Sequence, residues 1–417
     1  MTTARLHCLD CGADFPPVEH YACPECGGEL DIRYDHARIR EDGSFAQSWQ
    51  GPAPMAQRFA AFLPLAAPEA AASLGEGNTP LVRSHNIARK LGLRDLYFKL
   101  EGANPTGSFK DRQVAIAISK ARELGRNRFA TVSSGNVGNA LAAYAAHIGG
   151  TADVWVSEET AEAKRQQIAI YGAQLYLLPS PQAKDGPGPY FSALKGLPAF
   201  CACHGLVPMI SARPINPYMV EGAKAIAYEI AAALGRGPDV MFTPVGGGGL
   251  AGGIHKGFAD LAALGLVETL PQQRGGQRQA YFAPIDRMDE PQFQQGYYLP
   301  LDGHWAWQAI EASGGTLQVM PDDAIRAAQA MLAMEEGIFA EPHGAYAAAA
   351  LIEAAAEDKL DRDALTVCVI SGFGLKDMAA AREIIAAHGK PPARVASIGA
   401  SHELFLTKRG RHIDGQG

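Results

Sequence analysis

The chain lacks an apolar run long enough to span a membrane, and its opening residues, MTTARLHCLDCG, contain no hydrophobic signal segment. It also lacks a basic excess: the net charge of its 417 residues is −7, which argues against nucleic acid and anionic membrane surfaces as main partners. Charged residues make up only 19% of the chain and hydrophobic residues 47%, which is typical of folded globular proteins. We therefore expect a cytoplasmic protein of two domains with appendages, without a nucleic-acid or membrane partner.

Cysteines are few, but four of the seven lie within the first 26 residues. They form two CxxC pairs, each followed by glycine: Cys8, Cys11, Cys23 and Cys26. Four thiolates in this arrangement favour Zn²⁺ in a closed, tetrahedral structural site. The spacing predicts a zinc ribbon over residues 1–34, although a ribbon that no longer binds metal would show the same pattern. Its acidic residues make a poor phosphate-binding face, so we expect a structural lobe.

From about residue 95, short apolar runs alternate with longer Ala-rich amphipathic stretches. This alternation predicts an α/β protein whose parallel sheets are covered by helices on both faces. The expected strands are 96–100, 129–134, 153–157, 174–178, 207–211, 239–245, 279–285 and 365–371. The expected helices between them include 115–125, 139–149, 223–235 and 344–356. Two inserts, 179–190 and 271–279, have loop composition, and residues 35–73 are expected to form an irregular connection.

Three strand–turn–helix junctions expose backbone N–H groups at a helix N-terminus, where an anion can bind. They are TVSSGNVGNA (131–140), TPVGGGGLAGG (243–253) and VISGFGLKD (369–377). The second contains a GxGxxG pattern, which would suit a dinucleotide. However, Glu268, the acid at roughly the required spacing of about 20 residues, precedes a loop instead of ending a second strand. The four consecutive glycines therefore favour a cup for one phosphate monoester.

Lys110, in NPTGSFKDR, is delivered by a Gly-Ser turn to the start of a helix. A phosphate cup, a positioned lysine and a second anion-binding turn are what pyridoxal phosphate needs, because a lysine condenses with its aldehyde and a cup holds its phosphate. The amides of the SSGN turn can bind a substrate carboxylate, which assigns Ser133, Ser134 and Gly135 to the substrate. The side chain of Asn136 can bond the ring hydroxyl of the cofactor.

The motifs PTGSFKDR, SSGN, GGGGL and SGFGLKD, in this order, resemble the fold type II (tryptophan-synthase-β-like) pyridoxal-phosphate enzymes. The CxxC ribbon before NTPL and the phrase INPYMVEG resemble the threonine synthase branch, and the similarity covers roughly residues 75–260 and 335–380. The resemblance implies a homodimer of two-domain subunits. It places a discontinuous cofactor-binding domain at 35–112 and 213–390, a small substrate-carboxylate domain at 113–212, and a tail at 391–417.

The same resemblance implies roles for single residues. Lys110 is the Schiff-base lysine, Asn136 bonds the ring hydroxyl, and Ser371 faces the pyridine nitrogen. The cofactor phosphate is held by Gly246, Gly247, Gly248 and Gly249, while Asn78 and Thr79 lie near the substrate. A neutral hydroxyl at the pyridine nitrogen makes a weaker electron sink than a carboxylate, so elimination is favoured over transamination and racemisation.

Three positions depart from the threonine synthase pattern. Val137 stands where a threonine is usual, and Met219 stands where an arginine is usual, while Arg213 appears upstream. The third departure is the run of four glycines, which replaces the glycine-asparagine cofactor loop of the family and is more similar to serine/threonine dehydratases and β-replacement synthases. Loss of these polar groups would weaken a substrate-phosphate site by several charge-assisted hydrogen bonds. We therefore expect a lyase acting on a carbon–oxygen or carbon–nitrogen bond, or a replacement synthase, working at Cβ of an amino acid.

Alternatives remain open at this point. The chain could be a true threonine synthase acting on O-phosphohomoserine, with Arg213 rebuilding the anion site. It could be a serine/threonine or diaminopropionate ammonia-lyase. From other classes, it could be a non-catalytic binding protein of this fold or an NAD-dependent dehydrogenase. Beside the lysine, Asp111 and Arg112 are expected to form buried ion pairs that brace the helix start, and His343 is expected to have a capping or packing role.

Overall fold

The computed structural model describes residues 3–43, 45, 49, 51, 53–179, 189–279, 284–287, 300–389 and 398. Met1–Ala381 forms one compact unit and Arg382–Gly417 a second. In the described ranges, no helix combines the length and apolar character needed to cross a membrane. The expected tail, 391–417, apart from residue 398, and most of the insert 179–190 lie outside the described residues.

The N-terminal lobe is a three-stranded antiparallel sheet in the order β2-β1-β3. Its strands are β1 (Ala4–Cys8), β2 (Asp14–Phe15) and β3 (Leu30–Tyr34). Alternate residues of β1 and β3 are buried, so one face of this small sheet packs on the body of the protein. Short helices follow it: α1 (His36–Asp42), α3 (Met55–Arg58), and the 3-10 turns η1 (Ala60–Phe62) and η2 (Pro68–Ala70).

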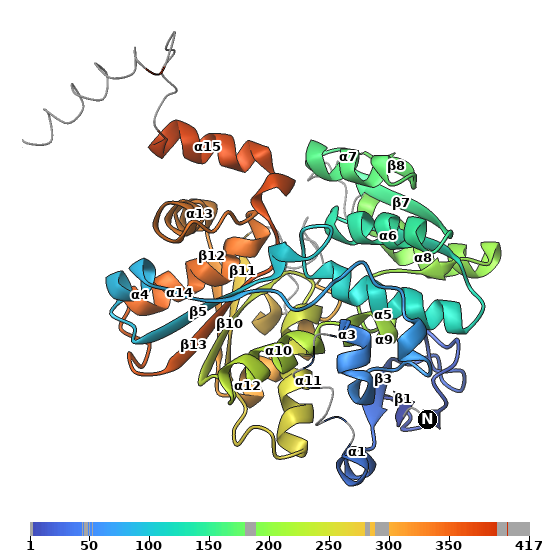
Figure 1. Cartoon of the computed structure of the whole chain (residues 1–417). Helices are drawn as coiled ribbons and strands as arrows, with labels where there is room; N and C mark the ends of the chain where they lie inside the picture. The colour runs from blue at the N-terminus through green and yellow to red at the C-terminus, as the bar shows by residue number, and fades with distance from the viewer. Residues whose placement is uncertain are drawn as a thin grey trace, which may run out of the picture. The chain divides into compact units, whose positions relative to one another are not determined.

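A six-stranded mixed sheet in the order β12-β11-β10-β13-β5-β4 forms the first layer of the body (Figure 1). All neighbouring pairs are parallel except β4 with β5. The strands are β4 (Leu81–Arg83), β5 (Asp95–Leu100), β10 (Val240–Val245), β11 (Gln272–Arg278), β12 (Thr316–Met320) and β13 (Leu365–Ile370). The helices belonging to this part are α4 (Asn86–Leu91), α10 (Lys224–Leu234), α11 (Gly249–Ala263), α12 (Gly303–Ala312), α13 (Asp322–Glu336) and α14 (Tyr346–Ala356).

Side chains of this sheet alternate between two hydrophobic cores, as period-2 strands require. On β10, Met241 belongs to the core made with α10 and α11, whereas Phe242 belongs to the core made with α13 and α14. On β13, Val367 and Cys368 divide in the same way. The prediction that helices cover both faces of the sheet is confirmed.

A second, fully parallel sheet has the order β8-β7-β6-β9. Its strands are β6 (Arg128–Val132), β7 (Thr151–Ser157), β8 (Gln174–Leu178) and β9 (Val207–Pro208). The helices around it are α5 (Lys110–Glu123), α6 (Asn136–His147), α7 (Glu162–Ile170) and α8 (Pro189–His204), and α9 (Pro217–Glu221) leads back to the larger sheet. Phe129 packs with α5 and α6, while its neighbour Ala130 packs with α8, so this sheet is also covered twice.

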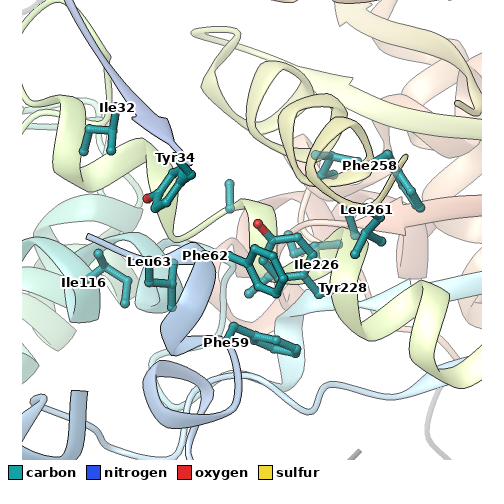
Figure 2. Close-up of a cluster of buried hydrophobic side chains, with 14 of the residues drawn as sticks. Ile32, Tyr34, Phe59, Phe62, Leu63, Ile116, Ile226, Tyr228, Phe258 and Leu261 are labelled. Atoms are coloured by element: carbon teal, nitrogen blue, oxygen red, sulfur yellow. The ribbon is translucent and has the colours of Figure 1, made fainter. Parts of the chain in front are cut away.

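The N-terminal lobe shares a hydrophobic core with the body. Figure 2 shows Ile32 and Tyr34 of β3 in the cluster that contains Tyr228 of α10 and Phe258 of α11. Residues 55–63, from the segment expected to be irregular, fill the space between them, and Phe59 lies 5.1 Å from Tyr228 between ring centroids. Because burying such aromatic side chains dominates core energetics, the lobe folds as part of the body.

One predicted loop is wrong. Residues 271–279 contain β11, which pairs in parallel with β10 and β12 near one edge of the larger sheet. The sequence QQRGGQR lacks the apolar residues of an ordinary buried strand because the strand lies against the main chain of α14. A Cβ added at Gly276 would lie 2.2 Å from the carbonyl oxygen of Tyr346. Among its described residues, the strand expected at 279–285 is instead a turn at Gln279 and a 3-10 helix, η4 (Ile285–Arg287).

The other strands and helices expected from the sequence are confirmed within a few residues, whereas β4 and β12 were not expected. The remaining elements are η3 (Glu101–Ala103), η6 (His343–Ala345), η7 (Gly374–Lys376) and α15 (Met378–His388). The three sheets lie in the predicted segments of the chain. Division into separate domains at those boundaries stays a prediction, since Met1–Ala381 forms a single compact unit.

Candidate active site

One cavity brings together Lys110 and the three glycine-containing junctions. Each junction follows the carboxyl end of a parallel strand, β6, β10 or β13, which is where open α/β sheets bind ligands. Of the residues predicted for the site, the cavity wall contains Lys110, Ser133, Ser134, Asn136, Gly246, Gly247, Gly248, Gly249 and Ser371. Residues that are more than 250 positions apart in sequence therefore share one wall.

Lys110 is the first residue of α5 and is held there by the third junction. The backbone N–H of Phe109 donates to the carbonyl oxygen of Ser371 at 3.1 Å, and Gly107 supplies the left-handed turn before it with φ of 89°. The Lys110 ammonium donates to Ser211 Oγ at 2.6 Å and to Gln113 Oε1 at 3.2 Å. Both partners are neutral, so burial lowers the pKa of Lys110 to about 7.

Lys110 in the cofactor-free protein is expected to react with acetic anhydride with a midpoint near pH 7. Only the neutral amine attacks the reagent, and burial makes the neutral form prevail from about that pH upward. An ordinary lysine has its midpoint near about 10.4, so Lys110 should be acetylated preferentially between pH 7 and 9. Mass spectrometry of the tryptic peptides, with surface lysines as internal references, measures this. A midpoint above pH 9 for Lys110 would contradict the prediction.

The glycine turn after β10 forms a cup at the N-terminus of α11, whose free N–H groups attract an anion. Gly248 caps the helix with φ of 100°. A Cβ added there would lie 2.4 Å from the carbonyl oxygen of Asp302, and one at Gly249 would lie 2.5 Å from Asp302 Oδ2. At Gly247 an added Cβ meets nothing within 4 Å. Two of the glycines thus allow α12 to approach, and a third faces open space that a phosphate can fill.

Asn136 is the first residue of α6 and lines the same cavity. Its Nδ2 donates to Glu341 Oε1 at 2.5 Å, while its Oδ1 is buried and has no hydrogen-bond partner among the described residues. Glu341 is itself paired with Lys164 at 2.8 Å, so the amide of Asn136 is held by a buried ion pair. Together with Ser371 at the end of β13, which is buried, these groups fit the polar edges of a pyridoxal ring.

Sequence reasoning missed several side chains of the cavity. Lys164 and Ser211 line it, as does His343, which was expected to have a packing or capping role. The His343 ring lies 4.6 Å from that of Tyr346, and burial lowers the pKa of His343 to about 4, so its imidazole is neutral. Lys164 sits in EAKRQQ, a segment without a recognisable motif, and no local signal marks it.

The structure does not bring four of the predicted substrate residues into the cavity wall: Asn78, Thr79, Gly135 and Arg213. Thr79 Oγ1 donates to Glu101 and accepts from Arg112, and the backbone N–H of Asn78 donates to Glu229. Both residues thus belong to a buried ionic network next to α5. Gly135 adjoins the cavity, and its φ of 121° shapes the SSGN turn. Arg213 contacts the N-terminal lobe, and its part in substrate binding stays a prediction.

Arg112 forms the expected buried ion pairs, but Asp111 does not. The Arg112 guanidinium bonds both oxygens of Glu101 and both oxygens of Glu229, at 2.7 to 2.9 Å. Asp111 instead accepts hydrogen bonds from the backbone N–H and hydroxyl of Thr106, and burial raises its pKa to about 7. Its carboxylate closes the NPTGSFK turn, and among the described residues no cation lies within ion-pair distance of it.

The four N-terminal cysteines converge on one point, with their sulfur atoms all within 4.8 Å of one another. Sγ of Cys8 lies 3.5 Å from that of Cys26, and Sγ of Cys11 lies 3.7 Å from that of Cys23. A tetrahedral zinc with Zn–S bonds of about 2.3 Å requires S–S separations of about 3.8 Å, so the cluster fits the ion. The cysteines are free rather than joined as disulfides, which the same fit requires.

Comparison with known proteins agrees with this geometry. Residues 72–372 match the family described as pyridoxal-phosphate dependent enzyme. The threonine synthase of Methanocaldococcus jannaschii is 34% identical over 389 residues, which cover 90% of this chain and 93% of that protein. The threonine synthase of Methanosarcina acetivorans is 33% identical over 420 residues, with 97% and 99% covered.

Solved structures resemble the fold at lower sequence identity. O-ureido-L-serine synthase superposes with a TM-score of 0.60 at 21% identity, covering 79% of this chain and 96% of that one. Diaminopropionate ammonia lyase of Escherichia coli, in its apo form, also gives 0.60, at 17% identity, covering 75% and 87%. At these identities the two structures bear on the fold alone.

Proposed function

The chain belongs to the family of pyridoxal-phosphate-dependent enzymes, and we propose that it eliminates or replaces a substituent at Cβ of an amino acid. The observation that carries the proposal is the single cavity whose wall contains Lys110, the glycine cup and residues of the SSGN turn. The cup suits the cofactor phosphate, the SSGN amides suit the substrate carboxylate, and the lysine shares their cavity.

When bound, pyridoxal phosphate supplies an aldehyde that condenses with amines and a ring that withdraws electrons from the attached carbon. Gly246 to Gly249 would hold its phosphate, Asn136 its ring hydroxyl and Ser371 its pyridine nitrogen. Lys110, neutral in part at pH 7, removes the proton from Cα of the substrate. Because burial lowers the pKa of Lys110 to about 7 and its hydrogen-bond partners, Ser211 and Gln113, are neutral, a substantial fraction of the amine is unprotonated at neutral pH and available as a base.

Cβ chemistry is favoured by what lines the remaining wall. Val137 contributes an apolar side chain to the cavity where a phosphate-binding hydroxyl would be expected, and Met219 is fully buried in the core. Arg213 lies outside the cavity wall. A second candidate, threonine synthase, is supported by the full-length similarity to proteins of that name and by Lys164, a cation in the cavity wall that could meet a substrate anion.

The four-cysteine cluster would hold a structural zinc ion, because its four ligands leave no open position for substrate or water. We also propose that the protein is a homodimer, because it resembles the family, and that it is cytoplasmic, because of the composition of the chain.

The test is a panel of amino acids added to the purified, cofactor-loaded protein: O-phosphohomoserine, O-phosphoserine, serine, threonine and diaminopropionate. Visible spectra are recorded while released phosphate, ammonia and 2-oxo acid are measured. A β-substituted substrate is expected to change the spectrum and to release its leaving group, ammonia or both. Threonine and phosphate from O-phosphohomoserine would establish the second candidate instead. A colourless protein insensitive to borohydride would contradict both and leave a binding role or a nicotinamide enzyme.

A further inference from the structure

The N-terminal lobe is tied to the body by several ionic contacts, and one of them leads to the glycine cup. Lys256 bonds Asp31, His36 bonds Asp260, and Arg126 bonds Glu19. These ties hold the lobe in place without approaching the cavity wall. The fourth tie, between Glu29 and Arg213, differs because Arg213 also contacts α12.

Glu29 is placed by both cysteine pairs. It lies three residues after Cys26, and its backbone N–H donates to Asp10 Oδ2 at 3.0 Å, where Asp10 lies between Cys8 and Cys11. The backbone N–H of Leu9 donates in turn to the carbonyl oxygen of Glu29 at 2.9 Å. The position of the Glu29 carboxylate therefore depends on the folded state of the four-cysteine loop pair.

Arg213 transmits that position to the start of α12. Its Nε donates to Glu29 Oε1 at 2.5 Å, and its guanidinium carbon lies 4.5 Å from the centre of the Trp305 ring. Its backbone N–H donates to Asp302 Oδ1 at 2.8 Å. The Arg213 side chain is only 11% exposed, so its stacking on Trp305 is largely shielded from water, whereas the Glu29 side of the salt bridge is 31% exposed.

Asp302 and Trp305 form the back wall of the cup. The Asp302 backbone N–H donates to the carbonyl oxygen of Gly247 at 2.7 Å. The Trp305 ring packs so closely on Gly252 that a Cβ added at this glycine would lie only 2.4 Å from the ring. The second carboxylate oxygen of Asp302 is buried beside Gly249 and has no hydrogen-bond partner among the described residues. This carboxylate lies behind the cup, outside the cavity wall, and the nearby Arg213 cation favours its charged form.

We propose that Arg213 is a positioning residue that couples the metal site of the lobe to the cofactor cup. With the metal bound, Glu29 holds the guanidinium over Trp305 and close to Asp302, and the back wall of the cup is fixed. Without the metal, Glu29 loses its place, Arg213 is freed, and the cup binds the cofactor phosphate less tightly. This inference rests on the proposed function, since it needs both a metal in the cysteine cluster and pyridoxal phosphate in the cup.

The experiment measures pyridoxal phosphate affinity of the full-length protein by absorbance titration, with zinc bound and after zinc removal by a chelator under reducing conditions. Zinc removal is expected to raise the dissociation constant about tenfold, within the roughly 5- to 150-fold range of known couplings between sites. By reciprocity, saturating pyridoxal phosphate should raise zinc affinity by the same factor.

Variants separate this route from simple loosening of the lobe. Arg213→Met keeps the backbone N–H to Asp302 but removes the guanidinium; its affinity with zinc should match that of the zinc-free wild type, and zinc removal should then change it less than twofold. Glu29→Gln changes the more exposed partner of the salt bridge and should also reduce the effect of zinc removal on the cofactor affinity. Because this site is more exposed, the variant is expected to fold even if Arg213→Met does not. Arg126→Met is the matched control, because it removes another arginine–glutamate tie to the lobe and should leave the coupling intact.

The outcomes distinguish this inference from the proposed function. Equal affinities with and without zinc in the wild type, or a coupling that survives in Arg213→Met, would overturn the inference while the enzyme remains a pyridoxal-phosphate protein. Failure of the wild type to bind pyridoxal phosphate under any condition would overturn the proposed function itself.

Discussion

Lys110→Ala protein is expected to lose turnover by roughly a thousandfold or more and to remain folded. The loss follows because the residue is proposed to bind the cofactor aldehyde and to move the substrate proton, and neither can be replaced by a neighbour. The fold should survive because the partners of Lys110 satisfy one another: the Ser211 hydroxyl donates to Gln113 Oε1 at 2.6 Å. Steady-state rates with the best substrate of the panel, together with thermal unfolding, measure both effects.

The stability of this variant should also depend on pH in a defined direction. The pKa of Lys110 is lowered to about 7 in the folded chain, so between pH 7 and about 10.4 the unfolded chain binds a proton that the folded chain lacks. The cost of burying the ammonium is therefore complete below pH 7 and fades as pH rises. Relative to the wild type, Lys110→Ala should be most stabilised at or below pH 7. Lys120→Ala, on the same helix, is the control that should keep turnover; retained turnover in Lys110→Ala would refute the assignment.

Arg112→Met is expected to destabilise the protein by about 3–5 kcal/mol, the usual cost of breaking a buried ion pair by removing one partner. The side chains of Arg112 and Glu101 are both 0% exposed, and Glu229 and Lys99 complete a neutral set of four charges. Without Arg112, two buried carboxylates share a single lysine. Urea unfolding of the variant at pH 7 measures the loss. Arg122→Met, at an exposed site of the same helix, should change stability by less than about 0.5 kcal/mol.

The deficit of Arg112→Met should shrink as the pH is lowered. Burial alone would raise the pKa of Glu229, but Arg112 and Lys99 together hold it below its ordinary value. This contribution is present above the pKa of an unfolded glutamate, about 4.3, and is lost as pH falls through the folded value. In the variant the carboxylates protonate more easily and the uncompensated charge disappears. A deficit below 1 kcal/mol at pH 7, or one that grows toward pH 4, would contradict the role given to this network.

Much of the site could be predicted from sequence because its parts are local motifs placed by a general rule. SSGN, GGGG and SGFG each follow a strand, and parallel strands bring their carboxyl ends to one edge, so the three turns and Lys110 had to be near one another. Lys164 and Glu341 could not be predicted in this way. Glu341 accepts a hydrogen bond from Asn136, which lies 205 positions earlier in the sequence. Neither Lys164 nor Glu341 belongs to a motif that predicts a position in the site.

The fold shows the same limit. Most strands with apolar runs were predicted correctly, the one expected at 279–285 being the exception. In contrast, β11 was taken for a loop because its sequence contains two glycines, which are typical of turns, and no apolar side chain. It forms a strand because it pairs with β10 on one side and β12 on the other, and because α14 packs against it. The N-terminal lobe was likewise predicted as an appendage, because the pattern of four cysteines contains no sign that Ile32 and Tyr34 enter the main core.

The glycine pair of β11 also bears on how this sequence can change with time. Side-chain tips surround the place where a Cβ at Gly275 would stand, at 2.9 to 3.0 Å, and tips can shift; at Gly276 the obstacle is the main chain of Tyr346, which cannot. Every single-nucleotide change that replaces glycine by another amino acid introduces a Cβ. Glycine at position 276 thus cannot be replaced by any single substitution without a clash. Another residue becomes possible there only after the α14 backbone has moved.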